Sequence, residues 1–150
     1  MMLTGRCLCG KIQYEVEGPL PPLANCHCQF CRRAHGAAFV TVTWVSSSSF
    51  HITSGESSVH RHEVGVGFRG FCGSCGTRLY NGLNRGGGFV TLIISTLDAC
   101  PLGGPVMHIN VESKADWYSI SDDLPQYQSR PLDMAATLKS LQPRSEQAPG

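Results

Sequence analysis

The chain has 150 residues, which suits a single domain with a sizeable hydrophobic core. Its formal net charge is +1, so its overall charge does not attract it to nucleic acid or to an anionic membrane surface. Charged residues make up only 15% of the sequence and glycine occurs 17 times, a composition typical of short strands and tight turns rather than long solvated helices.

Seven segments have the pattern of strands. Residues 11–17 alternate between polar and apolar side chains, as a half-buried strand does. Residues 38–45 and 88–95 are rich in β-branched and aromatic side chains and are predicted to be buried strands. Weaker candidates are residues 50–53, 59–64, 77–80 and 107–111. Because turns rich in glycine, proline and serine separate these segments, the chain is predicted to be mainly β.

The only helix that the sequence predicts lies near the C-terminus. No stretch before residue 130 has a convincing helical period. After Pro131, Asp133 is a suitable cap, and Met134, Leu138 and Leu141 would share one side of a short helix. We therefore expect one domain at 1–130, followed at 131–150 by this helix and a disordered tail.

No segment is predicted to cross or enter a membrane. The longest apolar run, residues 89–94, is short and contains a threonine. The first residues lack the apolar run of a secretion signal. We therefore expect a cytoplasmic protein, and in that compartment clustered cysteines bind metal more often than they form disulfides.

Seven of the eight cysteines form three groups, which are Cys7 with Cys9, Cys26 with Cys28 and Cys31, and Cys72 with Cys75. A glycine directly follows Cys9 and another follows Cys75, and such a residue permits a tight turn whose backbone N–H groups point at the sulfurs. Two thiolates from each of two such turns supply the four ligands of a tetrahedral structural zinc site. The two pairs are therefore predicted to clamp the start of the domain to its middle.

The middle group has three thiols rather than four. Three thiolates on a short loop can hold one zinc ion and leave a coordination position open, which distinguishes catalytic from structural zinc. His27 lies between two of these cysteines and either points away from the metal or closes the site as a fourth ligand. Cys100 stands alone and is expected to be a partly buried bystander.

Other uses of the cysteines fit less well. Four disulfides would suit a secreted protein, and the C-x-C pairs would be strained if bridged. The cysteine spacings of ferredoxin-type iron–sulfur proteins are absent. An ordinary zinc ribbon has two C-x-x-C knuckles about 15–20 residues apart, whereas this chain has one C-x-C knuckle and a far longer gap.

Four motifs, in order, resemble the glutathione-dependent formaldehyde-activating enzyme family, to which centromere protein V is related. They are G-R-C-L-C-G at 5–10, C-H-C-Q-F-C-R at 26–32, F-C-G-S-C-G-T at 71–77 and P-x-x-H-I-x-x-x-S-K-A-x-W at 105–117. The likeness runs from about residue 3 to residue 128, and the tail after residue 130 lies outside it.

The resemblance implies a β-tent fold, in which small antiparallel sheets surround two zinc ions. It implies that Cys7, Cys9, Cys72 and Cys75 hold a structural zinc and that Cys26, Cys28 and Cys31 hold a catalytic zinc. It also implies a carbon–sulfur lyase that condenses formaldehyde with glutathione to S-hydroxymethylglutathione, or that acts on a similar thiol. The alternative is a non-catalytic binding module in which both zinc ions are structural.

Glutathione carries two carboxylates, so its pocket should supply cationic groups. Arg32 and Arg33 directly follow the three-cysteine loop and are the predicted substrate-binding residues; Arg69, Arg78 and Lys114 are weaker candidates. Trp117 is predicted to be a core aromatic. The expected partner is a small-molecule thiol, with no nucleic acid and no membrane, and the sequence does not indicate an oligomeric state.

Overall fold

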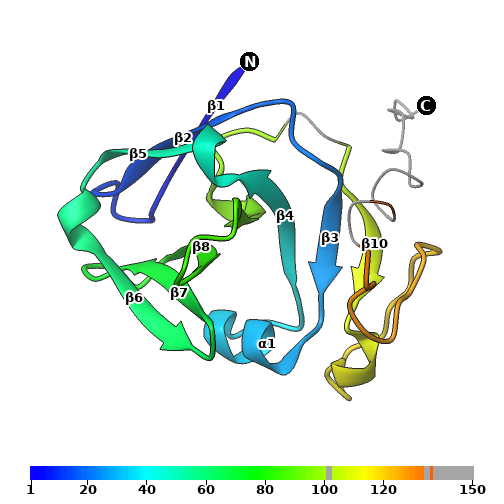
Figure 1. Ribbon diagram of the computed structural model, residues 1–150. Helices are drawn as coiled ribbons and strands as arrows, with labels where there is room; N and C mark the ends of the chain where they lie inside the picture. Colours follow the sequence, from blue (N-terminus) through cyan, green and yellow to red (C-terminus); the bar gives the residue numbers. More distant parts are fainter. Residues whose placement is uncertain (101–102, 134–135, 137–150) are drawn as a thin grey trace. The chain divides into compact units, whose positions relative to one another are not determined.

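The computed structural model describes residues 1–100, 103–133 and 136 (Figure 1). Within this part of the chain there are ten strands and one α-helix, so the prediction of a mainly β protein with small sheets is confirmed. The chain divides into two compact units. The first unit comprises Met1–Leu20 and Thr43–Cys100, and the second comprises Pro21–Val42 and the described residues after 100.

A three-stranded antiparallel sheet forms one part of the first unit. Its strands, in spatial order, are β1 (Met2–Arg6), β2 (Gln13–Glu17) and β5 (Phe50–Ser54). The alternation of polar and apolar residues that predicted β2 matches its burial, because Tyr14 and Val16 are buried whereas Gln13 and Glu17 are exposed. Strand β1 ends at Arg6, and the first cysteine pair begins at the next residue.

A series of antiparallel strands forms the other part of the first unit. In spatial order these are β9 (Phe89–Ile93), β8 (Arg78–Leu83), β7 (Gly67–Cys72) and β6 (Val59–Val64). The strands predicted at 59–64, 77–80 and 88–95 correspond to β6, β8 and β9. Phe68, Leu79 and Leu92 contribute to the core, and β7 ends at Cys72, the first residue of the second cysteine pair.

The second unit is built around a short, fully buried strand. All four residues of β3 (Leu23–Cys26) are buried, because β10 (Pro105–Ile109) pairs with one edge and β4 (Val40–Ser46) with the other. The sequence analysis did not predict β3, whose pairing with β4 is antiparallel and whose pairing with β10 is parallel. The C-terminal half of β4 continues into the first unit.

The absence of a helix before residue 130 was a wrong prediction, because α1 spans Gln29–His35 directly after β3. The helix has only seven residues, of which Cys31 alone is buried, so it leaves no helical period in the sequence. Cys28 caps its N-terminus, and the backbone N–H of Gly36 closes its C-terminus on Arg32. Short 3-10 helices lie at Ser47–Ser49, Glu56–Ser58, Ile94–Thr96 and Val111–Ser113.

Some expectations about individual residues also changed. Trp117 is 74% exposed and so is not a core residue, and Cys100 is exposed rather than partly buried. The backbone N–H of Ala136 donates to the Asp133 carboxylate over 2.9 Å, which is the contact of a helix cap, while the rest of the predicted C-terminal helix and tail lies outside the described residues. The division into a domain at 1–130 and a tail remains a prediction.

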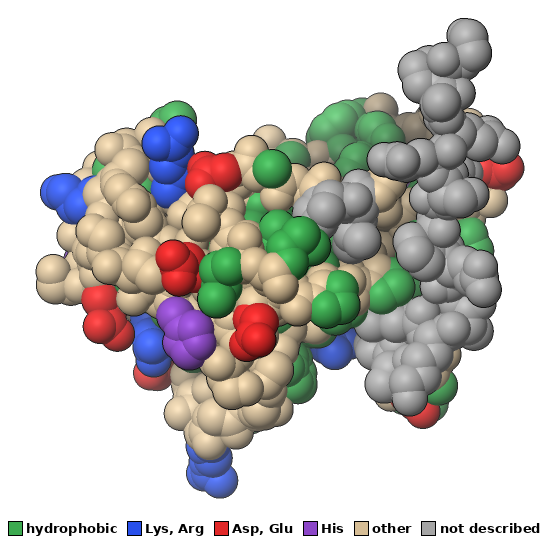
Figure 2. Space-filling view, turned by 90° about the horizontal axis from the view of Figure 1, so that it is seen from above, with side chains coloured by type: hydrophobic (Ala, Val, Ile, Leu, Met, Phe, Trp, Pro, Cys, Tyr) green, Lys and Arg blue, Asp and Glu red, His purple; other side chains and the backbone are tan. Residues whose placement is uncertain are grey.

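Two expectations from the sequence concern the charge of the surface and the crossing of a membrane. On the face that Figure 2 presents, Lys and Arg side chains are interspersed with Asp and Glu side chains and do not gather into one patch. None of the helices that the described residues form is long and apolar enough to cross a bilayer.

Candidate metal centres

The first unit brings the two cysteine pairs together. The sulfurs of Cys7, Cys9, Cys72 and Cys75 all lie within 4.8 Å of one another. Cys7 and Cys9 are separated by 3.5 Å and Cys9 and Cys72 by 3.9 Å, far beyond the roughly 2.05 Å of a disulfide. Four sulfurs around a tetrahedral zinc, each at about 2.3 Å, would be separated by about 3.8 Å. The spacing of this donor set therefore fits a zinc ion.

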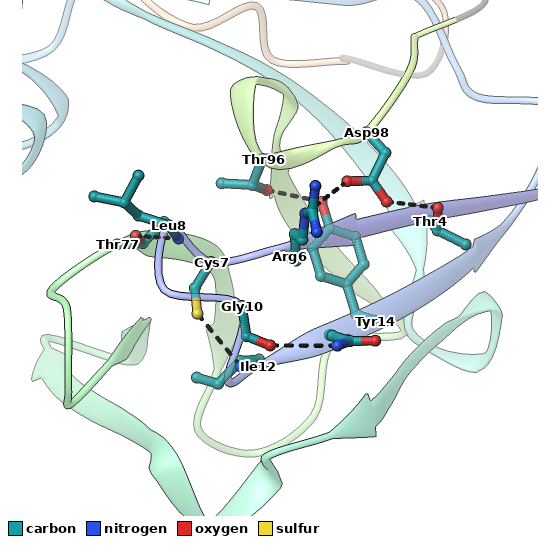
Figure 3. A network of polar contacts seen from close by, with 11 residues as sticks. Thr4, Arg6, Cys7, Leu8, Gly10, Ile12, Tyr14, Thr77, Thr96 and Asp98 are labelled. Carbon is teal, nitrogen blue, oxygen red and sulfur yellow. Dashed lines mark hydrogen bonds and ion pairs between the residues drawn. The ribbon is translucent and has the colours of Figure 1, made fainter.

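Two turns of the same design present these four sulfurs. After Cys7, the N–H of Gly10 bonds to the Cys7 carbonyl over 3.0 Å, and after Cys72 the N–H of Gly76 bonds to the Cys72 carbonyl over 2.8 Å. Both glycines have φ near +75°, a conformation that other residues rarely adopt. The N–H of Ile12 also donates to the Cys7 sulfur over 3.3 Å (Figure 3). The glycine after each pair thus has the role that the sequence predicted.

Side chains tie the two turns to each other. The backbone N–H of Leu8 donates to the hydroxyl of Thr77 over 3.0 Å (Figure 3). The same hydroxyl lies 3.2 Å from the Cys75 sulfur. On the other side, the Lys11 ammonium donates to the Ser74 hydroxyl over 2.8 Å. These contacts hold the two turns in place independently of any ion that the sulfurs bind.

The hydrogen bonds around this cluster favour thiolates. The side-chain and backbone hydrogen bonds of Thr77 lower the pKa of Cys75 to about 5. Burial opposes ionisation of Cys7, but the Ile12 N–H and the neighbouring thiols bring its pKa below the ordinary value. The Lys11 N–H favours the Cys9 thiolate, yet the adjoining sulfurs of the cluster raise the pKa of Cys9 to about 11. A bound cation would stabilise the thiolate form of all the sulfurs at once, so that one thiolate would no longer oppose the ionisation of the next.

The second unit brings together Cys26, Cys28 and Cys31, whose sulfurs also lie within 4.8 Å of one another. We call these residues the three-thiol cluster. Cys26 ends β3, Cys28 caps α1, and Cys31 lies in its first turn and donates its backbone N–H to the Cys28 sulfur over 3.3 Å. Each sulfur faces the other two, and together with burial this raises the pKa values of Cys26 and Cys31. The free thiols are therefore hard to ionise together unless a cation joins them.

His27 lies between two cysteines of this cluster but is turned toward β10. Its Nε2 atom is 2.8 Å from Nδ1 of His108, and the His108 Nε2 atom is 3.0 Å from the Asp122 carboxylate. Among the described residues, neither of the two candidate metal-binding groups includes a histidine nitrogen. The arrangement therefore follows the alternative in which His27 points away from the metal.

The predicted arginines take different positions on α1. Arg33 is exposed, whereas Arg32 is half-buried and its Nε atom is buried without a hydrogen-bond partner among the described residues. Lys114, a weaker candidate, is occupied by the backbone carbonyls of Ala115 and Tyr118. The substrate-binding role of Arg32 and Arg33 remains a prediction.

Two polar residues of this region were missed by the sequence analysis. Asn110 donates its side-chain amide to the Cys26 sulfur, and Asp122 completes the chain of hydrogen bonds through His108. Asn110 lies directly after P-x-x-H-I, at an unspecified position of the motif at 105–117, so the motif marks its neighbourhood but not the asparagine itself. Asp122 lies outside all four motifs and has no signal of its own.

Comparison with known proteins shows which family the chain belongs to. The model of the family described as "Glutathione-dependent formaldehyde-activating enzyme" matches residues 2–113, which include all seven clustered cysteines. The chain belongs to the glutathione-dependent formaldehyde-activating enzyme family. The resemblance seen in the sequence motifs is thereby confirmed.

Two individual proteins are similar to this chain. A Halomonas elongata protein named "Putative glutathione-dependent formaldehyde-activating enzyme" is 27% identical over 128 residues, which cover 80% of this chain and 82% of that protein. The crystal structure of a Rhodobacter sphaeroides protein is similar with a TM-score of 0.55 and 23% identity, and covers 65% of this chain and 91% of that one. The second likeness concerns the fold alone.

Proposed function

We propose that this member of the family is a zinc-dependent carbon–sulfur lyase that forms and cleaves the adduct of formaldehyde with glutathione or a similar thiol. The observation that carries the proposal is the unequal number of sulfurs in the two clusters, four in the first unit and three in the second. A complete set of four suits a structural ion, and a set of three suits a site that receives a ligand. Family membership supports the choice of thiol and aldehyde.

The reaction itself needs a thiolate. In the forming direction the thiol sulfur bonds to the aldehyde carbon, and the hydrogen of the thiol ends on the aldehyde oxygen as a hydroxyl; the reverse direction breaks the same carbon–sulfur bond. Because the thiolate is the nucleophile, a site that favours loss of the thiol proton accelerates the reaction. A zinc ion held by Cys26, Cys28 and Cys31 would supply a coordination position at which an incoming thiol loses its proton.

The residues around the three-thiol cluster support its charge and its ligand. The Asn110 amide donates to Cys26, which steadies a thiolate there. Arg32 and Arg33 are proposed to meet the carboxylates of glutathione, and the Nε atom of Arg32 is a donor that has no partner among the described residues. We expect Arg32→Ala to raise KM for the glutathione adduct and Arg85→Ala, a change at an exposed turn residue, to leave KM unchanged.

Cys28→Ser is the decisive variant. Serine retains the helix cap that Cys28 provides, so α1 should persist while the cluster loses a thiolate. Zinc content, measured by mass spectrometry of the purified protein, should fall from two to one per chain, and turnover of S-hydroxymethylglutathione should be lost. Cys100→Ser, which changes an exposed thiol outside both clusters, is the matched control. Two zinc ions and full activity in Cys28→Ser would disprove the proposal.

X-ray absorption at the zinc edge separates the enzyme from the alternative of a non-catalytic module. For the enzyme, the measured zinc coordination should be the average of two sites, one with four sulfurs and one with three sulfurs and a lighter atom. Two closed sites would favour the module. The cytoplasm is the proposed compartment, because its reducing conditions suit the free thiols of all eight cysteines.

A further inference from the structure

A cavity of about 520 Å³ lies within the first unit, and we call it the aromatic cavity. Side chains of β5, β6, β8 and β9 line it, together with the loop that joins β8 to β9. None of the clustered cysteines is part of this lining. Small-molecule sites in proteins usually have volumes of about 300–1,000 Å³, so the cavity has the size of a ligand site.

Glycines on neighbouring strands make room for two aromatic rings at this cavity. Phe68 of β7 lies opposite Gly82 of β8, and a Cβ atom at Gly82 would approach the Phe68 ring to 2.6 Å. In the same way, Tyr80 of β8 lies opposite Gly70 of β7, and a Cβ atom there would approach the Tyr80 ring to 2.8 Å. Each ring therefore lies over the backbone of the neighbouring strand, at a place that a side chain would otherwise occupy.

The rings are also packed against one another. Phe68 meets Tyr80 edge to face, with 5.8 Å between the ring centroids, and both residues are buried. Phe50 of β5 packs on Tyr80 at 4.8 Å, and Tyr14 of β2 supports Phe50 at 5.2 Å. Rings held in this way lose little freedom when a ligand binds, and their faces and edges favour a flat aromatic group.

One cationic side chain lies at this aromatic wall. Arg61 of β6 is exposed and pairs with Gly70 across β6 and β7, and its guanidinium carbon is 4.2 Å from the centroid of the Phe68 ring. Stacking of this kind orients the guanidinium plane and leaves its N–H edge available. Within the described part of the chain, the Arg61 side chain has no ion pair and no hydrogen bond. Such an edge binds a planar carboxylate through two parallel hydrogen bonds.

A second charged side chain restricts the choice of anion. Glu56, in the 3-10 helix Glu56–Ser58, also lines the cavity, and it forms no ion pair with any described residue, Arg61 included. A doubly charged phosphate group would be repelled by this carboxylate, whereas a single carboxylate is matched by Arg61. The lining therefore favours a ligand with one negative charge on a flat apolar body.

We propose that the aromatic cavity binds an aromatic monocarboxylate, with its ring against Phe50, Phe68 and Tyr80 and its carboxylate on the guanidinium of Arg61. The site uses neither cysteine cluster, so the proposal does not depend on the proposed function.

Calorimetric titration of the zinc-loaded full chain with 2-naphthoate tests the site. The wild type should bind this probe, and Arg61→Gln should bind it about tenfold or more weakly, because a hydrogen-bonded pair of charged groups is lost. The alcohol 2-naphthylmethanol has the same rings without the carboxylate, and it should bind both proteins equally. Arg85→Gln removes the same charge from an exposed residue outside the lining, and this control should keep the wild-type affinity for 2-naphthoate.

NMR of nitrogen-15-labelled protein locates the bound probe. Addition of 2-naphthoate should shift amide signals of β5, β6 and β8 and leave those of residues 26–32 in place. Cys28→Ser should bind the probe as the wild type does, so loss of lyase activity and loss of this site are distinguishable. Absence of binding at millimolar concentration, equal affinity in Arg61→Gln, or shifts centred on residues 26–32 would overturn the proposal.

Analytical ultracentrifugation tests the other occupant that such a cavity could take, a second copy of the chain. The sedimentation of the wild type should not change when Arg61 is replaced by glutamine. A concentration-dependent dimer that Arg61→Gln dissociates would place the second copy in the cavity and would also overturn the proposal.

Discussion

Asn110 donates its side-chain amide to the sulfur of Cys26 across 3.3 Å, although 84 residues separate them in the chain. The parallel pairing of β10 with β3 makes this contact possible, because it places Ile109 opposite Cys26 and Asn110 one residue further. Asn110 has φ +56°, and asparagine tolerates this left-handed conformation better than most residues. The residue directly after β10 therefore provides the hydrogen bond that supports the first thiol of the three-thiol cluster.

Asn110→Gly should weaken metal binding at the three-thiol cluster. Glycine accepts the same backbone conformation, so the change removes the amide without adding strain. Loss of a hydrogen bond to a ligand typically lowers metal affinity by about 10–100-fold. Competition with a chromophoric chelator should release one of the two zinc ions more readily, while the other is unaffected. Asn84→Gly, at an exposed residue after β8, is the control, and equal release from both variants would contradict the prediction.

The two metal centres should differ in what they contribute to stability. The first cluster joins residues 7 and 75, so losing it frees a long loop, whereas the three-thiol cluster joins only residues 26 to 31. Cys72→Ser should therefore lower Tm by roughly 10 °C or more, on the basis of about 3–5 kcal/mol lost with a structural metal. Cys28→Ser should lower Tm by much less. Thermal unfolding followed by circular dichroism measures both, and equal shifts would count against the division into structural and ligand-binding centres.

The sequence predicted those features of the site that are local. Both cysteine pairs are contained in single turns, and the glycine after each pair has the positive φ that such a turn needs. The alternation of β2 and the β-branched residues of β9 likewise depend on near neighbours. Local patterns of this kind are visible without knowledge of tertiary contacts.

What the sequence did not predict depends on long-range contacts or on very short elements. The helix α1 has too few residues for a period, and its cap is a cysteine, which is not among the usual capping residues. The parallel pairing of β10 with β3 and the hydrogen bond from His108 to Asp122 join segments by tertiary packing alone. Trp117 was assigned to the core from its size, but nothing local shows that its side chain is exposed.

Gly5→Ala should destabilise the first unit. Gly5 lies opposite Tyr14 in the β1–β2 pair, and a Cβ atom there would overlap the Tyr14 ring and approach the backbone oxygen of Thr96 to 2.7 Å. Because backbone cannot move aside cheaply, the variant should lose about 1–3 kcal/mol in the free energy of unfolding. Urea denaturation measures this loss. Gly18→Ala, whose added Cβ has its nearest neighbour at 3.4 Å, is the control, and equal stability of the two variants would contradict the expected overlap.

Tyr14 should make the stability depend on alkaline pH. The residue is 1% exposed, and burial, opposed by the hydrogen bond to Thr96 and reinforced by Asp98, raises its pKa to about 12. An unfolded chain releases this proton at a pH of about 10. The contribution of Tyr14 to the free energy of unfolding is therefore fully present below that pH and is lost as the pH rises toward 12. A shift of about two units corresponds to at most about 3 kcal/mol.

Urea unfolding of zinc-saturated protein at several pH values between 8 and 11 measures this contribution. Above pH 10 the wild type should lose stability more steeply than Tyr14→Phe, because phenylalanine has no proton to release from the unfolded chain. Tyr14→Phe should also be less stable than the wild type near pH 8, since it lacks the 2.7 Å hydrogen bond between the Tyr14 and Thr96 hydroxyls. Parallel slopes for wild type and Tyr14→Phe would show that Tyr14 ionises equally in the folded and unfolded chains.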